Sequence, residues 1–149
     1  RLEEEVARSQ RFGRQLSIMM LDLDGFKQYN DTFGHLAGDR ALEAIAIVIM
    51  HSVRSIDIVA RYGGDEFIII LPETNVNTAL MIGDRLRNDI AHSFLPTPEG
   101  VPEQHTVTVS VGLASYPEHD ASGANLIERA DTALYRAKAV GKNRIEVYS

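Results

Sequence analysis

The chain has 149 residues, no cysteine and a formal net charge of −6, with 44% hydrophobic and 24% charged residues. This length and composition indicate one globular domain with a sizeable core, and they exclude disulfides, thiolate zinc sites and cysteine nucleophiles. The acidic balance argues against nucleic acid as a partner, because a long polyanion normally needs a basic face. The longest purely apolar stretch, Ala44 to Met50, is too short to span a bilayer.

The first half of the chain predicts a helix, a strand and a second helix. Residues Leu2 to Gln15 mix glutamates and arginines with a few apolar residues, which is typical of an exposed helix with many ion pairs. The continuous apolar run from Leu16 to Leu23 predicts a strand buried on both faces, ending in the carboxylates of Asp22 and Asp24. After a loop with a short helix, the periodicity predicts a long helix from Asp39 to Arg54.

The second half predicts a hairpin and two further helices with strands between them. The expected elements, in order, are the hairpin strands Asp57 to Tyr62 and Glu66 to Leu71, a helix from Asn77 to Ser93, a loop from Leu95 to Gln104, a strand from His105 to Ser115, a helix from Gly123 to Gly141 and a strand from Arg144 to Ser149. This order implies an α+β fold with a mainly antiparallel central sheet flanked by helices. It is ferredoxin-like, with an added strand or hairpin.

Two carboxylates stand out because they are remote in sequence yet suited to one site. Asp22 ends a strand, and Asp65 follows two glycines in the hairpin turn. If the two strands are neighbours, both carboxylates reach the same edge and could bind a hard divalent ion of the kind used in phosphoryl transfer. The simpler interpretation is a pair of unrelated surface acids. A calcium loop starting at Asp22 is rejected, because Phe26 stands where its third ligand should be.

Three stretches together carry a family resemblance. The sequence GGDEF, Gly63 to Phe67, resembles the name-giving motif of the GGDEF family, the diguanylate cyclases. The stretches Leu21 to Asp39 and Ala130 to Arg144 resemble that family's other signature segments, in the right order. The resemblance covers nearly the whole chain and implies a single GGDEF domain over residues 1–149 with a palm-type, nucleotidyl cyclase-like fold. We expect this domain to be a fragment of a longer signalling protein whose N-terminal part has been removed.

The resemblance implies a metal-dependent enzyme that joins two GTP molecules into cyclic di-GMP and releases two pyrophosphates. Mg²⁺ or Mn²⁺, two ions per active site, would be held by Asp22, Asp65 and the carbonyl of Leu23. Asp65 would also accept the proton of the attacking 3′-hydroxyl, and Glu66 would lie beside the metals or the nucleotide. The alternative is a catalytically inactive module that binds GTP or cyclic di-GMP as a sensor.

The same resemblance assigns the substrate contacts. Lys27 would bind the triphosphate, while Asn30 and Asp39 would read guanine, because an amide and a carboxylate match its donors and acceptors. Asp39 has a competing interpretation as the N-cap of the helix that it is expected to begin. The full set of expected substrate-binding residues is Phe26, Lys27, Asn30, His35, Asp39, Gly63, Gly64, Glu66, Lys138 and Lys142.

Two further groups of cationic residues have both a functional and a structural interpretation. Lys138 and Lys142 would add the local positive charge that a triphosphate needs, or they would simply stabilise a helix C-terminus. Arg54 and Asp57 resemble the family's product-inhibition site, with Arg85 as a further arginine for cyclic di-GMP. An Arg-x-x-Asp pattern is otherwise usually a surface ion pair.

The resemblance also implies partners. Catalysis would need a homodimer in which two domains face each other, each holding one GTP. An upstream sensor domain is expected in the full-length protein. We expect a cytoplasmic location, with any membrane anchor in the missing upstream segment.

Overall fold

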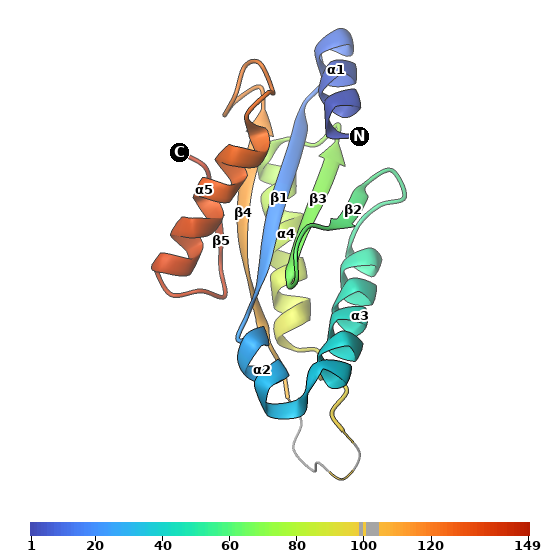
Figure 1. Ribbon diagram of the computed structural model, residues 1–149. Helices are drawn as coiled ribbons and strands as arrows, with labels where there is room; N and C mark the ends of the chain where they lie inside the picture. The colour runs from blue at the N-terminus through green and yellow to red at the C-terminus, as the bar shows by residue number, and fades with distance from the viewer. Residues whose placement is uncertain (99, 101–104) are drawn as a thin grey trace.

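The chain folds around a five-stranded sheet with strand order β2-β3-β1-β4-β5 (Figure 1). The computed structural model describes residues 1–98, 100 and 105–149. The strands are β1 (Leu16–Asp24), β2 (Ile58–Arg61), β3 (Glu66–Pro72), β4 (Thr108–Tyr116) and β5 (Ile145–Val147). Strand β1 is antiparallel to β3 and β4, β2 is antiparallel to β3, and β5 is parallel to β4. The predicted α+β fold with a mainly antiparallel sheet is therefore confirmed.

Helices cover both faces of the sheet. They are α1 (Leu2–Phe12), α2 (Phe26–Phe33), α3 (His35–Ser52), α4 (Val76–Ala91) and α5 (Leu126–Ala139). Because strand residues alternate between faces, Ile18 and Met20 of β1 pack in a core with residues of α1 and α5. Met19 and Leu21 pack in a second core with residues of α2, α3 and α4. Both faces of β1 are buried, as its unbroken apolar run predicts.

Helix α5 lies unusually close to the sheet at Gly112 of β4. A Cβ atom at Gly112 would stand 2.1 Å from the carbonyl oxygen of Ala130 and 2.3 Å from the backbone nitrogen of Leu134. No side chain fits there, so the backbone of α5 rests directly on the strand. This contact fixes the direction of α5 and carries its C-terminal end, with Lys138, toward the end of β1.

The boundary between α2 and α3 corrects one prediction. The sequence favoured a helix start at Asp39, but α3 begins at His35, and Gly34 is its N-cap residue. Gly34 has φ 89° and ψ 166°, a conformation that favours glycine and lets one residue end α2 and start α3. Asp39 therefore lies inside α3 and is not its N-cap. Its exposed carboxylate is not used to cap this helix.

The other boundaries agree with the sequence to within a few residues. Helix α1 is mostly exposed, as expected, although Val6 and Ser9 are buried. Strand β4 begins at Thr108, and His105 instead forms an isolated bridge with Leu95. Of the expected loop from Leu95 to Gln104, residues 99 and 101–104 lie outside the described residues.

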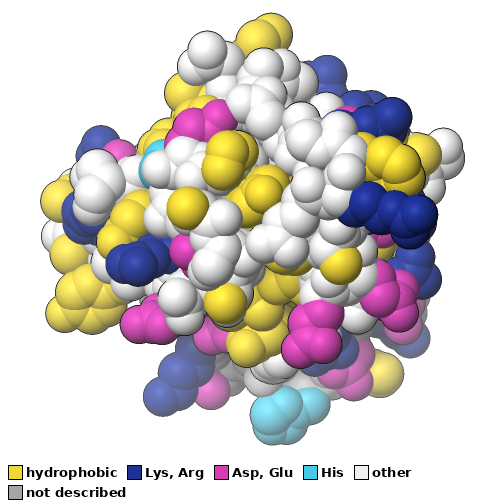
Figure 2. All heavy atoms as spheres, turned by 90° about the horizontal axis from the view of Figure 1, so that it is seen from above, with side chains coloured by type: hydrophobic (Ala, Val, Ile, Leu, Met, Phe, Trp, Pro, Cys, Tyr) yellow, Lys and Arg dark blue, Asp and Glu magenta, His cyan; other side chains and the backbone are white. Residues whose placement is uncertain are grey.

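The surface shows mixed charges on the face seen from above the view of Figure 1. On that face, acidic and basic side chains are interspersed, and hydrophobic side chains form small separate groups (Figure 2). Among the described residues, no helix has the length and apolar character needed to cross a membrane.

Candidate active site

The end of β1 and the β2–β3 hairpin meet at one edge of the sheet. Asp22 pairs with Glu66 across the β1–β3 ladder. One residue further on, the backbone N–H of Leu23 donates a 3.1 Å hydrogen bond to the carbonyl oxygen of Asp65. Strand register therefore brings Asp22 and Asp65 together, although they are 43 positions apart in the chain.

The charge on Asp22 is poorly compensated. The pKa of its carboxyl is raised to about 6, mainly because of burial and also because of the negative charges of Asp65 and Glu66, and the ammonium group of Lys138 only partly offsets this rise. Lys138 Nζ lies 3.3 Å from Asp22 Oδ2. The carboxylates gathered here thus favour an additional cation.

Asp24, two residues further along β1, has a very different environment. Burial raises its pKa, but hydrogen bonds from Thr108, Ser110, the backbone N–H of Asn143 and Lys138 outweigh burial and hold the pKa below its usual value. Asp24 is therefore a stable anion at neutral pH. Sequence reasoning placed it at the strand end but gave it no role.

The donor atoms at this edge fit a hard divalent cation. Two carboxylates, Asp22 and Asp65, and the carbonyl of Leu23 are oxygen ligands of the type that magnesium prefers. Lys138 already supplies one positive charge to Asp22. Among the described residues, no group of three or more His, Cys, Asp or Glu side chains is arranged to hold a metal ion. Protein ligands alone would therefore leave coordination positions open for water or for phosphate oxygens.

A groove of about 280 Å³ adjoins the acidic edge, the edge of the sheet that carries Asp22 and Asp65. It is lined by Phe26, Lys27, Asn30, His35, Asp39, Leu42, Arg61, Gly64 and Asp65. All of these except Leu42 and Arg61 were candidate site residues from the sequence. Segments from α2, α3 and the hairpin turn are needed to form this groove.

One wall of the groove holds Asn30 in a defined position. Asn30 Nδ2 and His35 Nδ1 are 3.0 Å apart and hydrogen-bonded. A Cβ atom at Gly38 would lie 2.0 Å from Asn30 Oδ1 and 3.0 Å from its Cγ, so the amide occupies space that any other residue at position 38 would fill. Sequence reasoning missed Gly38, since the local pattern does not show that the side chain of Asn30, from another helix, packs against this position.

The hairpin turn is held by Arg61, a second residue that sequence reasoning missed. Its Nε donates to the carbonyl oxygen of Gly63 (3.2 Å) and its Nη2 to that of Gly64 (2.7 Å). A Cβ atom at Gly64 would meet no atom within 4 Å. The turn thus presents a bare backbone to open space beside Asp65.

Four of the expected substrate-binding residues lie outside the lining of the groove. Gly63 and Glu66 belong to the hairpin, and Lys138 contacts the acids at the end of β1. Lys142 is exposed on the turn after α5, at φ 61°. The structure therefore divides the candidate site into a groove and an adjoining charged cluster, joined through Leu23 and Asp65.

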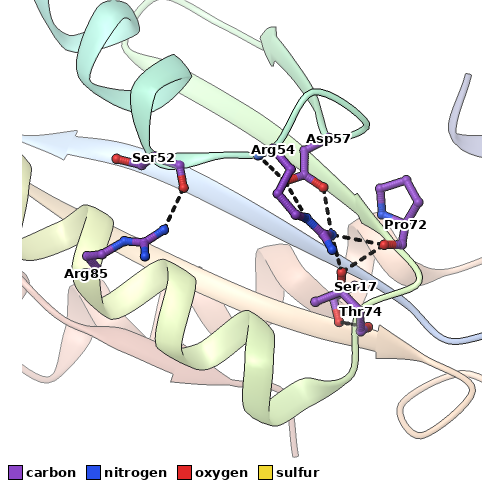
Figure 3. A network of polar contacts seen from close by, with 7 residues as sticks. All are labelled: Ser17, Ser52, Arg54, Asp57, Pro72, Thr74 and Arg85. Atoms are coloured by element: carbon purple, nitrogen blue, oxygen red, sulfur yellow. Dashed lines mark hydrogen bonds and ion pairs between the residues drawn. The ribbon is translucent and has the colours of Figure 1, made fainter.

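The candidate regulatory residues form a separate group at the other end of α3 (Figure 3). Arg54 Nη2 lies 2.9 Å from Asp57 Oδ1 and also donates to the carbonyl oxygen of Pro72 (3.1 Å) and to Thr74 Oγ1 (2.6 Å). Arg85 Nη2 donates to the carbonyl oxygen of Ser52 (2.9 Å). Helix α3 has 18 residues and is therefore about 27 Å long. The groove is lined by His35, Asp39 and Leu42 in the N-terminal half of this helix, so the two groups lie toward opposite ends of α3.

The fold and the groove define an α+β domain that gathers acidic, amide and basic groups where strand β1 ends. The family model described as "Diguanylate cyclase, GGDEF domain" matches residues 1–144. The chain belongs to the GGDEF family.

The most similar proteins include curated diguanylate cyclases. The chain is 44% identical over 147 residues to diguanylate cyclase DgcP of Pseudomonas aeruginosa, covering 99% of this chain and 21% of that protein. It is 40% identical over 146 residues to diguanylate cyclase DosC of Escherichia coli, covering 98% of this chain and 31% of that protein. The chain spans about a fifth to a third of the length of these relatives.

A solved structure also matches closely. The GGDEF domain of DgcB from Caulobacter crescentus, in complex with c-di-GMP, superimposes with a TM-score of 0.89 at 33% identity, covering 98% of this chain and 85% of that chain. The predicted family and fold are confirmed.

Proposed function

We propose that this domain is a diguanylate cyclase that condenses two GTP molecules into cyclic di-GMP and releases two pyrophosphates. The observation that carries the proposal is the meeting of Asp22 and Asp65 at one sheet edge, beside a groove lined by Lys27, Asn30 and Asp39. Relatives named diguanylate cyclases support it. GTP chemistry and magnesium are consistent with a cytoplasmic domain.

Asp22, Asp65 and the carbonyl of Leu23 would hold Mg²⁺ or Mn²⁺, two ions per site. Bound metal would neutralise charge on the phosphate oxygens and favour attack at the α-phosphate. Asp65 would accept the proton of the attacking 3′-hydroxyl, since it lines the groove at the turn. Glu66 pairs with Asp22 across the sheet and would add negative charge that strengthens cation binding.

The groove would bind the guanine and the phosphates at different positions. The carboxylate of Asp39 accepts hydrogen bonds from guanine N1–H and the 2-amino group, and the amide of Asn30 donates to O6. Adenine presents the opposite pattern, so these residues reject ATP. His35 would hold the amide of Asn30 in place, and Phe26 would form the wall of the groove. Lys27, from the same helix as Asn30, would bind the triphosphate.

The reaction needs two copies of the domain. Each would present its bound α-phosphate to the 3′-hydroxyl of the GTP in the other copy, so that positioning supplies much of the catalysis. An upstream segment, with its sensor domain, would align the two copies. The rate per domain is expected to rise with protein concentration, and a constant rate in a range where the protein is monomeric contradicts the dimer.

Product inhibition would use Arg54, Asp57 and Arg85. Arg54 follows the C-terminal end of α3, and Arg85 of α4 donates to the carbonyl oxygen of Ser52 at that end. The two guanidinium groups would offer planar donors to guanine or phosphate there (Figure 3). Arg54 is already held by Asp57 and Thr74, which would present it to the product at little entropic cost. Cyclic di-GMP is bound in the DgcB complex.

The direct test is incubation of the protein with GTP and Mg²⁺, followed by separation and mass analysis of the nucleotides. We expect cyclic di-GMP and two equivalents of pyrophosphate. GTP binding without turnover, even at high protein concentration, would instead indicate a sensor module. The presence of Asp22, Lys27 and the intact Gly63 to Phe67 motif favours the enzyme.

A further inference from the structure

Asp24 connects three segments of the chain at the end of β1. Its Oδ1 accepts hydrogen bonds from Ser110 Oγ (2.8 Å) and Lys138 Nζ (3.0 Å). Its Oδ2 accepts from Thr108 Oγ1 (2.8 Å) and from the backbone N–H of Asn143 (3.0 Å). The donors come from β4, from the last turn of α5 and from the turn that follows α5.

This bonding leaves Asp24 no capacity to act as a metal ligand. An ionised carboxylate has about four lone-pair positions, and all four are occupied by protein donors. The side chain is only 7% exposed, compared with 23% for Asp22. The two acids lie on the same face of β1 and do different work. Asp22 keeps acceptor positions that a cation could use, whereas the acceptor positions of Asp24 are filled by hydrogen bonds.

The turn bound by Asp24 has an unusual backbone. Gly141, Lys142 and Asn143 have φ values of 133°, 61° and 45°. Left-handed conformations at two consecutive non-glycine residues persist only where the surroundings fix them. Two hydrogen bonds from backbone N–H groups fix these conformations here. The Lys142 N–H donates to the carbonyl oxygen of Ala137 (2.9 Å), and the Asn143 N–H donates to Asp24.

We propose that Asp24 is a positioning residue that holds Lys138 and the Lys142 turn so that both ammonium groups face the triphosphate. This inference rests on the proposed function, in which these lysines bind phosphate. Asp24 touches neither nucleotide nor metal and acts through its hydrogen-bond donors. Lys138 contacts both acids. Because Asp24 holds the ammonium group in place and shares its positive charge, Lys138 only partly neutralises Asp22.

The test is a comparison of nucleotides that differ in phosphate number. In the presence of Mg²⁺, calorimetry with a non-hydrolysable GTP analogue and with GMP separates binding of the phosphates from binding of the base. For Asp24→Asn, we expect the Kd of the GTP analogue to rise by about tenfold, the loss of one charge-assisted contact. The Kd of GMP should change by less than about twofold, because the base groove between α2 and α3 does not involve Asp24.

A double-mutant cycle shows whether Asp24 acts through the lysines. If it does, Asp24→Asn adds little to the Kd of the GTP analogue in a Lys138→Ala, Lys142→Ala background. Additive effects, or equal losses for GMP and the GTP analogue, overturn the inference.

A milder pair of variants serves if Asp24→Asn fails to fold. Thr108→Val removes one donor to Asp24 without changing side-chain shape, and Thr106→Val makes the same change two residues away, at an exposed position. We expect Thr108→Val to weaken binding of the GTP analogue and Thr106→Val to leave it unchanged. Equal binding by both variants overturns the inference. Failure of the wild-type protein to bind the GTP analogue contradicts the proposed function itself, whereas unchanged binding in the variants contradicts only the role of Asp24.

Discussion

The backbone N–H of Leu23 donates a 3.1 Å hydrogen bond to the carbonyl oxygen of Asp65. This bond joins the end of the central strand to the hairpin turn and places the carboxylates of Asp22 and Asp65 at one edge. The same edge borders the groove that contains Lys27 and Asn30. The proposed metal-dependent reaction would therefore depend on the contact between two segments that are remote in sequence.

Asp22→Asn should stabilise the metal-free protein at neutral pH while abolishing turnover. The pKa of Asp22 is raised to about 6 from 3.8, so the folded state binds a proton more tightly than the unfolded state. Stability is then lost as pH rises from 3.8 to about 6, by up to about 3 kcal/mol. Denaturant unfolding in EDTA between pH 4 and 7.5 should show a smaller decline for the variant. Asp24→Asn is the matched control and should destabilise, because the pKa of Asp24 is lowered.

Gly64→Ala should leave the fold intact and impair the reaction. A Cβ atom at this position meets no protein atom within 4 Å, so the free energy of unfolding should stay within about 1 kcal/mol of wild type. A methyl group at the turn would displace the nucleotide beside Asp65, and a misplacement of about 1 Å costs roughly 100-fold in turnover. Thermal melting and cyclic di-GMP production measure the two effects. Full activity of this variant would show that GTP does not approach the turn.

Gly38→Ala should weaken recognition of guanine. The new Cβ atom would occupy the space of the Asn30 amide, and losing one hydrogen bond of about 1 kcal/mol raises KM for GTP roughly fivefold. Discrimination against ATP should fall as well. Leu36→Ala, at a position that is 68% exposed in the same helix, is the control. An unchanged ratio of kcat/KM for GTP and ATP would contradict the role of Asn30.

Arg54→Ala should relieve product inhibition without loss of catalysis. Arg54 follows the C-terminal end of α3 and does not line the groove. Losing its charge-assisted bonds to cyclic di-GMP should raise the inhibition constant by about tenfold or more. Initial rates at increasing cyclic di-GMP concentrations measure this effect. Ser55→Ala, an exposed neighbour, should behave like wild type, and inhibition that persists in Arg54→Ala would place the product elsewhere.

The sequence predicted the fold and the acidic edge because both depend on local patterns. The apolar run before Asp22 and the two glycines before Asp65 define a buried strand and a hairpin, and antiparallel pairing of such elements brings their ends together. The start of α3 was wrong, because a helix that begins after Gly34 has no Ser, Thr, Asp or Asn cap to mark it. Asp39 was the first residue with that signal.

The residues that sequence reasoning missed act across elements. Gly38 accommodates a side chain of another helix, and Arg61 binds carbonyl oxygens of a turn. Asp24 takes its role from donors that lie 84 to 119 positions away. No local periodicity carries such information, since it depends on how the helices and strands pack.

The most direct measurement is a crystal structure of the protein with Mg²⁺ and a non-hydrolysable GTP analogue. We predict a metal ion with oxygen ligands from both Asp22 and Asp65 at about 2.0–2.1 Å, with guanine against Asn30 and Asp39. An ion bound without either carboxylate, or a nucleotide seated away from the groove, would contradict the account.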